Sequence, residues 1–320
     1  IDAHNRLVWV RATDADGNAW DVPVNVLPLG TYAHDLSVAI VNGNPAIAYT
    51  LGIVGTATEG LMYVRANDPN GQSWGTPVAV DLAADSGLEP DLEVVNGKPA
   101  IAYWRDDTFF TTTHYVQASD ADGQAWGAPV QVSGNTFFGA LAPDLEVVNG
   151  HPAVAYHTSA GLLYRRASDA DGSAWAVADT LRPGLDHALI ELKVIGGIPC
   201  LAYKNTDQDQ GEFMHALDAD GAAWSGYTTI YLTTGLLGLE LMEIMGNPAA
   251  VVHLEQSETL EYRRSCTVEG TQWFGCGVWG ATIDAAAGNA SVYPSVAMVN
   301  GYPAVAYAIA GSTPTALRYC

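Results

Sequence analysis

Acidic side chains recur at alternating positions in a segment that the sequence repeats six times. In the second copy, Asp91 and Glu93 are separated by one apolar residue, so both carboxylates project from the same face of a β-strand. The aligned positions of other copies hold the further acids Asp144, Glu146, Glu191 and Glu240. If these strands line a central channel, the carboxylates form an acidic ring that suits Ca²⁺ or another hard cation. The alternative is a solvated channel without a specific ligand.

Aromatic and basic side chains fall in irregular segments between the repeated ones. The residues that we expect to bind a ligand there are Trp104, Arg105, Phe109, Phe110, His157, Lys204 and His253. Exposed rings stack on sugars or anchor a protein partner, because planar groups give a large contact area at small entropic cost. The alternative is that these rings pack against their own loops. No close Cys/His spacing indicates a zinc site.

Five acids of the irregular segments could instead serve an enzyme. They are Asp106, Asp107, Asp186, Asp207 and Glu255. Two carboxylates about 5 to 10 Å apart in a cleft would support a glycosidase. However, no set of nucleophile, base and oxyanion donors recurs or converges in the sequence. We therefore assign no catalytic residue and place a glycosidase or lyase second.

Two short sequence elements, each present six times, define the fold. The first is an apolar run, a turn with glycine, a proline and then small and β-branched residues, as in Ile40–Tyr49. The second is an aromatic residue, a polar loop, a glycine and a tryptophan three residues later, as in Tyr115–Trp126. Asn-Gly and Asp-Gly between apolar runs indicate hairpins, because such turns need residues that tolerate positive φ. Each repeat therefore predicts four antiparallel strands.

Six units of four strands predict an all-β fold, a six-bladed β-propeller in which radial repetition covers most sheet edges. We expect residues 1–320 to form this single domain. The chain begins with a third and fourth strand, within Leu7–Val26, and ends with a first and second, within Val296–Tyr307. The two termini would then close one blade. Residues 316–320 resemble another third strand, so either this tail or Leu7–Val10 takes the third place, or the chain continues further.

The regular turns and the irregular connections have different roles in such a blade. The turns after the first and third strands are nearly copied six times, as expected where backbone geometry dictates the residue. The connections after the second and fourth strands diverge and lie at the opposite end of the strands. Binding residues concentrate on variable loops held by a rigid scaffold, so we expect function at the irregular end.

The second repeated turn resembles the Asp-box of sialidase-like β-propellers, which has the pattern Ser-x-Asp-x-Gly-x-x-Trp. Ser119, Gly123 and Trp126 fit this pattern, but the acids Asp120 and Asp122 stand three and one residues before the glycine rather than two. The whole chain is also similar to secreted bacterial repeat proteins built from such units. The resemblance implies the propeller fold and structural turns away from a catalytic face, and it implies no particular reaction.

Neither sialidase chemistry nor calcium binding follows from these turns. A sialidase would need three converging arginines and a tyrosine nucleophile assisted by a carboxylate. The recurrent arginines precede the turn glycines by six residues and belong near the regular turns; they are Arg11, Arg65, Arg166 and Arg264. The Asp-x-Asp-Gly sequence has too few oxygen ligands for a calcium loop. We expect its carboxylates to accept backbone N–H groups in Asx-type turns.

Charge and cysteines indicate where the protein works. Thirteen basic against thirty-five acidic residues give a net charge of −22, which disfavours nucleic acid and anionic lipid. No apolar run is long enough to insert into a membrane. Cys266 and Cys276 flank one hairpin and predict a disulfide, hence an oxidising, extracellular or cell-surface location. Cys200 replaces an alanine of a second strand and predicts a buried thiol.

These observations favour a non-catalytic extracellular binding or scaffolding propeller. Its expected partner is a glycan or another extracellular protein, recognised through the irregular connections. The first alternative is a glycosidase or lyase of the same fold, and the second is a structural subunit of a surface layer or filament. No cofactor is expected apart from a cation in the channel.

Overall fold

The computed structural model shows an all-β chain. It describes residues 7–28, 31–52, 59–83, 86–107, 110–135, 141–184, 187–231, 235–255, 257, 259–274, 281–284, 294–309 and 316–319. Within these residues the regular structure consists of strands, and no helix is long and apolar enough to cross a membrane. The chain divides into two compact units, Ile1–Thr180 and Leu181–Cys320.

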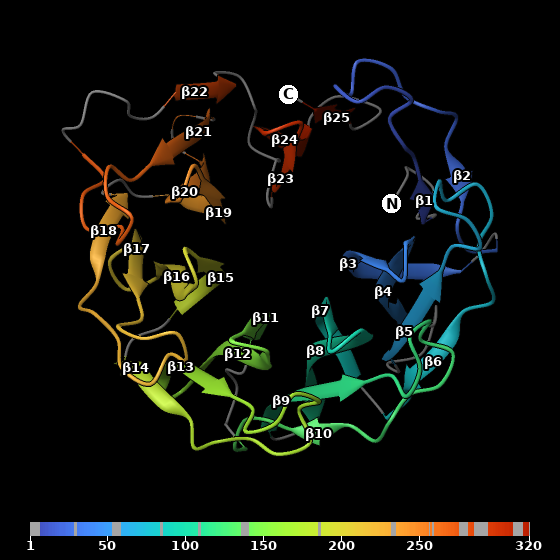
Figure 1. The fold of residues 1–320 in the computed structure, drawn as a ribbon, viewed down its shortest axis with the longest axis horizontal. Coiled ribbons are helices and arrows are strands. Elements are labelled where there is room, and N and C mark those ends of the chain that lie inside the picture. The colour runs from blue at the N-terminus through green and yellow to red at the C-terminus, as the bar shows by residue number, and fades with distance from the viewer. Residues whose placement is uncertain are drawn as a thin grey trace. The chain divides into compact units, whose positions relative to one another are not determined.

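The described part of the first unit contains one two-stranded and three four-stranded antiparallel sheets (Figure 1). The two-stranded sheet consists of β1 (Val8–Trp9) and β2 (Val24–Asn25). The first four-stranded sheet consists of β3 (Tyr32–Val41), β4 (Asn44–Gly52), β5 (Glu59–Arg65) and β6 (Val78–Asp81). The second consists of β7 (Ser86–Val95), β8 (Lys98–Asp107), β9 (Phe110–Gln117) and β10 (Val130–Gln131). The third consists of β11 (Leu141–Val148), β12 (His151–Thr158), β13 (Gly161–Arg166) and β14 (Asp179–Pro183), which spans the boundary between the units.

The described part of the second unit contains two four-stranded sheets and one three-stranded sheet. The first consists of β15 (His187–Ile195), β16 (Ile198–Asn205), β17 (Gln210–His215) and β18 (Thr228–Tyr231). The second consists of β19 (Leu236–Ile244), β20 (Asn247–Leu254), β21 (Thr259–Arg264) and β22 (Ala281–Asp284). The three-stranded sheet consists of β23 (Ser295–Val299), β24 (Tyr302–Ile309) and β25 (Ala316–Tyr319).

The C-terminal segment takes the third place in the last sheet. β25 pairs with β24, with Tyr319 opposite Ala306, which is the register that Tyr63 and Ala48 adopt in β5 and β4. β1 pairs with β2 instead, in the separate two-stranded sheet. Of the alternatives that the sequence left open, the tail rather than Leu7–Val10 therefore takes the third place in this sheet. The edge of β24 is already paired to the tail.

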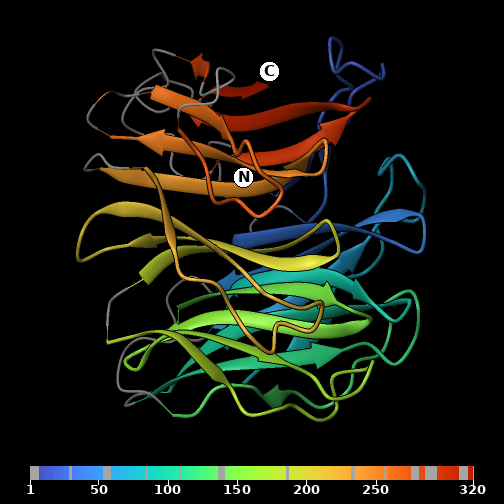
Figure 2. The ribbon, with the colours of Figure 1, turned by 60° about the vertical axis from the view of Figure 1, so that its left-hand side comes forward.

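The strands in each sheet follow one another in chain order, as hairpins dictate. The expected Asn-Gly turns form, with φ of 45° at Asn42 and 79° at Gly43 between β3 and β4. The hairpin prediction is confirmed in every four-stranded sheet, because each strand pairs with the next one along the chain. Figure 2 shows the paired strands of a sheet lying side by side.

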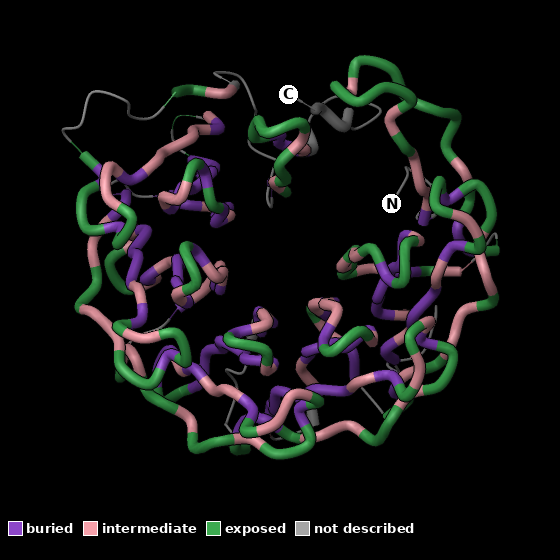
Figure 3. Tube along the Cα trace, viewed as in Figure 1, coloured by how far each residue is buried: buried purple, intermediate pink, exposed green. Residues whose placement is uncertain are grey.

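Apolar cores lie between neighbouring sheets. One core joins Ala46, Ala48 and Tyr63 of the β3–β6 sheet to Ile101 and Tyr103 of the β7–β10 sheet. Small residues on the second strand let the next sheet approach closely, so the tyrosine rings become fully buried. Figure 3 shows buried positions concentrated inside the sheets and exposed positions at the turns. Packing between sheets, rather than within one sheet, therefore provides the core.

The regular turn between the third and fourth strands is held by a carboxylate. Asp120 accepts backbone N–H groups of Asp122, Gln124 and Ala125 at 2.8 to 3.1 Å. Burial raises the pKa of Asp120, but these backbone donors outweigh it and the pKa lies below its ordinary value. The equivalent acids Asp14, Asp68, Asp169 and Asp218 also accept backbone N–H groups. The expected Asx-type turns are confirmed.

The glycine of this turn presses against an aromatic ring of the preceding sheet. Gly123 has φ of 74°, and a Cβ built on it would lie 2.5 Å from the Tyr63 ring. The glycines Gly71, Gly172 and Gly270 meet the rings of Trp9, Tyr115 and Phe213 in the same way. A side chain at these positions would push neighbouring sheets apart.

Replacing Gly123 by Ala should lower the free energy of unfolding by about 2–4 kcal/mol, because left-handed backbone strain adds to the clash with Tyr63. Gly43→Ala carries the strain without the clash, since nothing lies within 4 Å of its Cβ, and should cost about 1–2 kcal/mol. Gly134→Ala has open space and should change little. Urea unfolding followed by circular dichroism measures all three. Equal losses for Gly123→Ala and Gly43→Ala would show that the ring contact is unimportant.

Candidate functional site

The first strand of several sheets contains a β-bulge near its start. The register shifts between His34 and Leu36 in β3, between Leu88 and Asp91 in β7, and between Ala188 and Glu191 in β15. The residues at the shift share one repeat position and have positive φ: 44° at Asp35, 46° at Glu89 and 51° at Leu189. Two of the three are acids, and these two lie in neighbouring sheets of the first unit.

This backbone geometry is unfavourable for residues other than glycine. The left-handed conformation costs roughly 1–2 kcal/mol for an ordinary residue, and glutamate has no special tolerance for it. β-Bulges and such conformations occur preferentially beside functional sites, where they re-aim a side chain. Asp35 and Glu89 are therefore candidates for chemistry.

Four contacts connect the two acids and three aromatic rings. The Glu89 backbone N–H donates to Asp35 Oδ2 at 3.4 Å, and Trp104 Nε1–H donates to Glu89 Oε2 at 3.1 Å. His34 Nδ1 lies 3.2 Å from Asp35 Oδ2, and the His34 and Tyr32 rings are 5.6 Å apart. Asp35, Glu89 and Tyr32 are exposed, and His34 and Trp104 are half-buried. We call these five residues the bulge site.

An ion pair between the buried Asp81 and the half-buried Arg105 fixes the strand that carries Trp104. Asp81, at the end of β6, accepts hydrogen bonds from the Tyr103 hydroxyl at 2.6 Å and from Arg105 Nε at 2.8 Å. Burial raises the pKa of Asp81, but the bonds from Tyr103, the Ala83 backbone and Arg105 together hold it below its ordinary value. The carboxylate is therefore ionised and locks β8 against the preceding sheet.

His114 lies beneath this ion pair. Its ring stacks on Tyr103 at a centroid distance of 5.7 Å, and its Nε2 lies 2.9 Å from the Thr112 hydroxyl. Burial and then the positive charge of Arg105 lower the pKa of His114 from its ordinary 6.5 to about 4. The imidazole is therefore neutral at neutral pH.

An equivalent cluster in the second unit holds a tyrosine and a carboxylate. The Tyr203 hydroxyl donates to Glu212 Oε2 at 2.8 Å, Asn205 donates to Oε1 at 2.9 Å, and Arg182 pairs with the carboxylate at 3.0 Å. A tyrosine paired with a carboxylate is what sialidase-type chemistry requires. Here, however, both side chains are fully buried, and burial raises the pKa of Tyr203. The Tyr203 phenol therefore stays protonated and contributes to the packing of the buried core.

The predicted ligand-binding residues are only partly brought together. Trp104 lies in the bulge site, and Arg105 is held by Asp81 behind it. Phe110 is half-buried opposite Asp107, at the start of β9. His157 in β12, Lys204 in β16 and His253 in β20 lie near the ends of three separate second strands. Both histidines are buried, and Lys204 pairs with Asp209 at 2.7 Å. Phe109 lies outside the described residues.

The acids predicted to bind a cation mostly make local contacts. Asp91 accepts the Ser37 hydroxyl at 3.2 Å and the Leu145 N–H at 2.7 Å, so it ties β7 to the first strands on either side. Glu93 and Glu146 each accept the N–H of the next residue. Asp144 is buried, and Glu191 and Glu240 are half-buried in the second unit. Among the described residues, no three His, Cys, Asp or Glu side chains gather closely enough to hold a metal ion, and the cation stays a prediction.

The acids of the predicted enzyme alternative lie in separate places. Asp106 is half-buried near the end of β8, whereas Asp207 and Glu255 are exposed in the second unit. The side chain of Asp107 and the whole of Asp186 lie outside the described residues.

The sequence analysis did not identify Asp35 and Glu89 as candidate site residues. The signal that could have identified them is an acid at the same repeat position in two copies, two residues before Ser37 and two residues before Asp91.

The cysteines agree in part with their predictions. Cys200 is free and buried, and burial raises the pKa of its thiol to about 12, which confirms the predicted buried thiol. Cys266 takes part in a disulfide. Its predicted partner Cys276 lies outside the described residues, so the pairing stays a prediction.

Comparison with solved structures identifies the fold as that of sialidase-type β-propellers. The NanB sialidase of Streptococcus pneumoniae superposes with a TM-score of 0.61 and 10% identity, over 92% of this chain and 69% of the sialidase chain. The polysaccharide lyase Uly1 superposes with a TM-score of 0.54 and 13% identity, over 87% of this chain and 74% of the lyase chain. No protein-family model and no curated protein matches the sequence.

These comparisons correct the functional prediction. The sequence favoured a non-catalytic binding or scaffolding propeller, whereas the two matching structures named above are a sialidase and a polysaccharide lyase. The finding supports the glycosidase or lyase alternative over the non-catalytic reading. The non-catalytic prediction rested on the lack of a catalytic set that recurs or converges in the sequence, and alternation does not reveal the register shifts that form the bulge site.

The buried His114 should make stability depend on pH. Its pKa is lower in the folded chain than in the unfolded chain, so its contribution is complete above pH 6.5 and is lost as the pH falls towards 4. His114→Gln should reduce the loss of unfolding free energy between pH 7 and pH 4 by on the order of 2 kcal/mol. Urea titrations at several pH values measure this difference.

His151→Gln is the matched control, because His151 is only half-buried on a regular turn. It should retain the pH dependence of the original protein. Identical pH dependence in all three proteins would contradict the burial of a neutral His114.

Proposed function

We propose that the protein is a carbohydrate-active propeller enzyme whose active site is the bulge site. The observation that carries the proposal is the contact of the Glu89 backbone N–H with the Asp35 carboxylate, which brings together two acids at strained bulges of neighbouring sheets beside the half-buried Trp104. The shared fold of a sialidase and a polysaccharide lyase supports carbohydrate as the substrate class.

Glycoside hydrolysis is the reaction that two such acids serve best. One carboxylic acid protonates the departing glycosidic oxygen, while a second carboxylate activates water or attacks the anomeric carbon. Asp35 faces the His34 ring, and a protonated imidazole stabilises a neighbouring carboxylate. Asp35 therefore acts as the carboxylate in this scheme, and Glu89 supplies the proton. Trp104 offers a flat surface on which a sugar ring stacks.

Elimination from a uronate-containing polysaccharide is the second candidate. A lyase needs a base that removes the proton next to the uronate carboxyl group, and it needs no water. The pair of His34 and Tyr32, with ring centroids 5.6 Å apart at the edge of the bulge site, supplies a base and a proton donor. The fold of Uly1 supports this candidate.

The proposal also includes the number of blades, the closure of the propeller and the location of the protein. The sixfold repeat supports a single six-bladed, closed propeller over residues 1–320, with Asp-box-like turns. The disulfide of Cys266 supports an oxidising, extracellular location.

Charge removal at the bulge site tests the proposal. Glu89→Gln keeps the acceptor for Trp104, and Asp35→Asn keeps a residue that tolerates positive φ. Each should lower kcat by about 100-fold or more, as expected for loss of a general acid or base. The assay screens aryl glycosides and polysaccharides, and it follows released reducing ends for hydrolysis and the ultraviolet absorbance of unsaturated ends for elimination.

Glu269→Gln is the control, because Glu269 is an exposed acid on a regular turn. It should retain full activity, and all three variants should keep the circular dichroism of the original protein. Undiminished turnover by Glu89→Gln and Asp35→Asn would place the active site elsewhere. Absence of turnover on every substrate of the panel would contradict the proposed enzymatic activity.

A further inference from the structure

An open pocket of about 530 Å³ lies between two regular turns of the first unit. It is formed where β5 ends and β6 begins, at the end of the strands opposite the bulge site. The side chains that line it include Asn67, Trp74, Thr76 and Gln124. Its volume falls within the range of small-molecule sites, about 300–1,000 Å³.

The walls of this pocket are rigid. Trp74 Nε1–H donates to the Gly71 carbonyl at 3.0 Å, and its ring meets the edge of Trp9 at 5.7 Å, so the indole has a fixed orientation. The turn that carries Gln124 is held by Asp120 and packs on Tyr63, whose hydroxyl donates to the Asp122 carbonyl at 3.2 Å. A ligand would therefore find a preformed surface, and little binding energy would be spent on ordering it.

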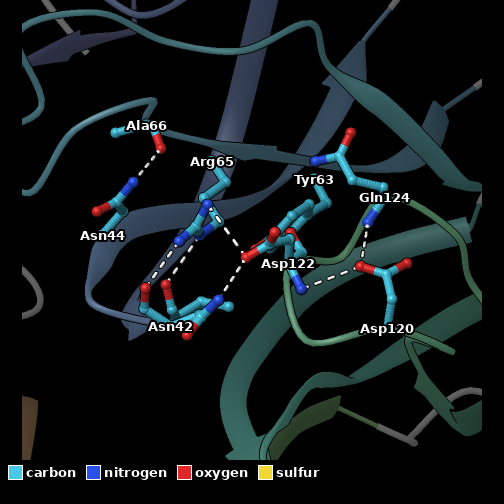
Figure 4. A network of polar contacts seen from close by, with 9 residues as sticks. Asn42, Asn44, Tyr63, Arg65, Ala66, Asp120, Asp122 and Gln124 are labelled. Carbon is cyan, nitrogen blue, oxygen red and sulfur yellow. Dashed lines mark hydrogen bonds and ion pairs between the residues drawn. The ribbon is translucent and has the colours of Figure 1, made fainter.

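The pocket has no uncompensated charge. Arg65 donates to the carbonyl groups of Val41 and Asn42, each at 2.8 Å, and pairs with Asp122 at 3.3 Å (Figure 4). Asn42 also donates to the Asp122 carboxylate at 2.8 Å. The charged groups neutralise one another and leave two amides, a hydroxyl and an indole. This lining favours a neutral, polyhydroxylated ligand over an ion.

The polar lining departs from the repeat. The next pair of turns places Ser119, Ala128 and Ser173 at the positions of Asn67, Thr76 and Gln124. The pair after that has Ser168, Val177 and Ala222. The scaffold therefore folds with short or apolar side chains at these positions. Asn67 donates to Ser73 Oγ at 3.4 Å within its own turn, but a serine makes the corresponding bond in the next two turns, so the longer amide, which can donate and accept at once, exceeds what the turn requires.

We propose that this pocket is a second carbohydrate-binding site, which holds a sugar unit of a neutral oligosaccharide on the Trp74 ring. The amides of Asn67 and Gln124 and the hydroxyl of Thr76 bond the sugar hydroxyls. Such a site would keep a polymeric glycan on the protein independently of the bulge site.

Isothermal titration calorimetry with cellohexaose, xylohexaose and triacetylchitotriose tests the proposal. At least one oligosaccharide should bind, and Asn67→Ser or Gln124→Ser should weaken its affinity about threefold to tenfold each, the effect of one lost hydrogen bond. The triple variant with Thr76→Ala should lose measurable binding. These substitutions introduce residues that the neighbouring turns already carry, so the variants should fold.

Two controls separate this pocket from other sites. Gln72→Ser makes the same change at the same repeat position outside the pocket lining and should leave the affinity unchanged. Glu89→Gln alters the proposed active site and should also leave this binding unchanged. Absence of binding by all three oligosaccharides, or equal affinity of the triple variant and the original protein, would overturn the proposal.

Discussion

The packing of neighbouring sheets depends on a close contact between an aromatic ring and a glycine. At Gly123 a single added carbon would collide with the Tyr63 ring, so the turn rests directly on the preceding sheet. The Asp120 carboxylate preserves the shape of this turn, and the tryptophan three residues after the glycine meets the edge of the same ring. The sequence repeats these three features because each serves the same contact.

Buried tyrosines show how the repeat tolerates variation in charge. Tyr103 and Tyr203 occupy the same position at the end of the second strand. The residue opposite Tyr103 is His114, whereas the residue opposite Tyr203 is Glu212. Each phenol has a carboxylate partner, although Asp81 comes from the preceding sheet and Glu212 from the same sheet. At these two positions the buried hydroxyl is satisfied by different arrangements of charge.

The irregular and regular ends of the strands differ in how freely their residues vary. At the regular end, backbone geometry dictates glycine and aspartate, and only side chains beside the turn change, as at Asn67 and Gln124. At the irregular end, bulges re-aim side chains of the first strand, which places Asp35 and Glu89 side by side from segments 54 residues apart. A carbohydrate-active surface can therefore arise at the irregular end without disturbance of the core.

The sequence by itself determined the hairpins, the all-β fold and the Asx-type turns, because local dihedral preferences and alternation fix them. Asn42–Gly43 and Asp120 needed no knowledge of distant residues. Only the tertiary structure decided that β25 pairs with β24, and that Asp91 bonds to Ser37 and the Leu145 N–H. It also decided the bulge site, since a one-residue register shift changes which face a side chain occupies. That shift depends on contacts between strands, which a linear pattern does not contain.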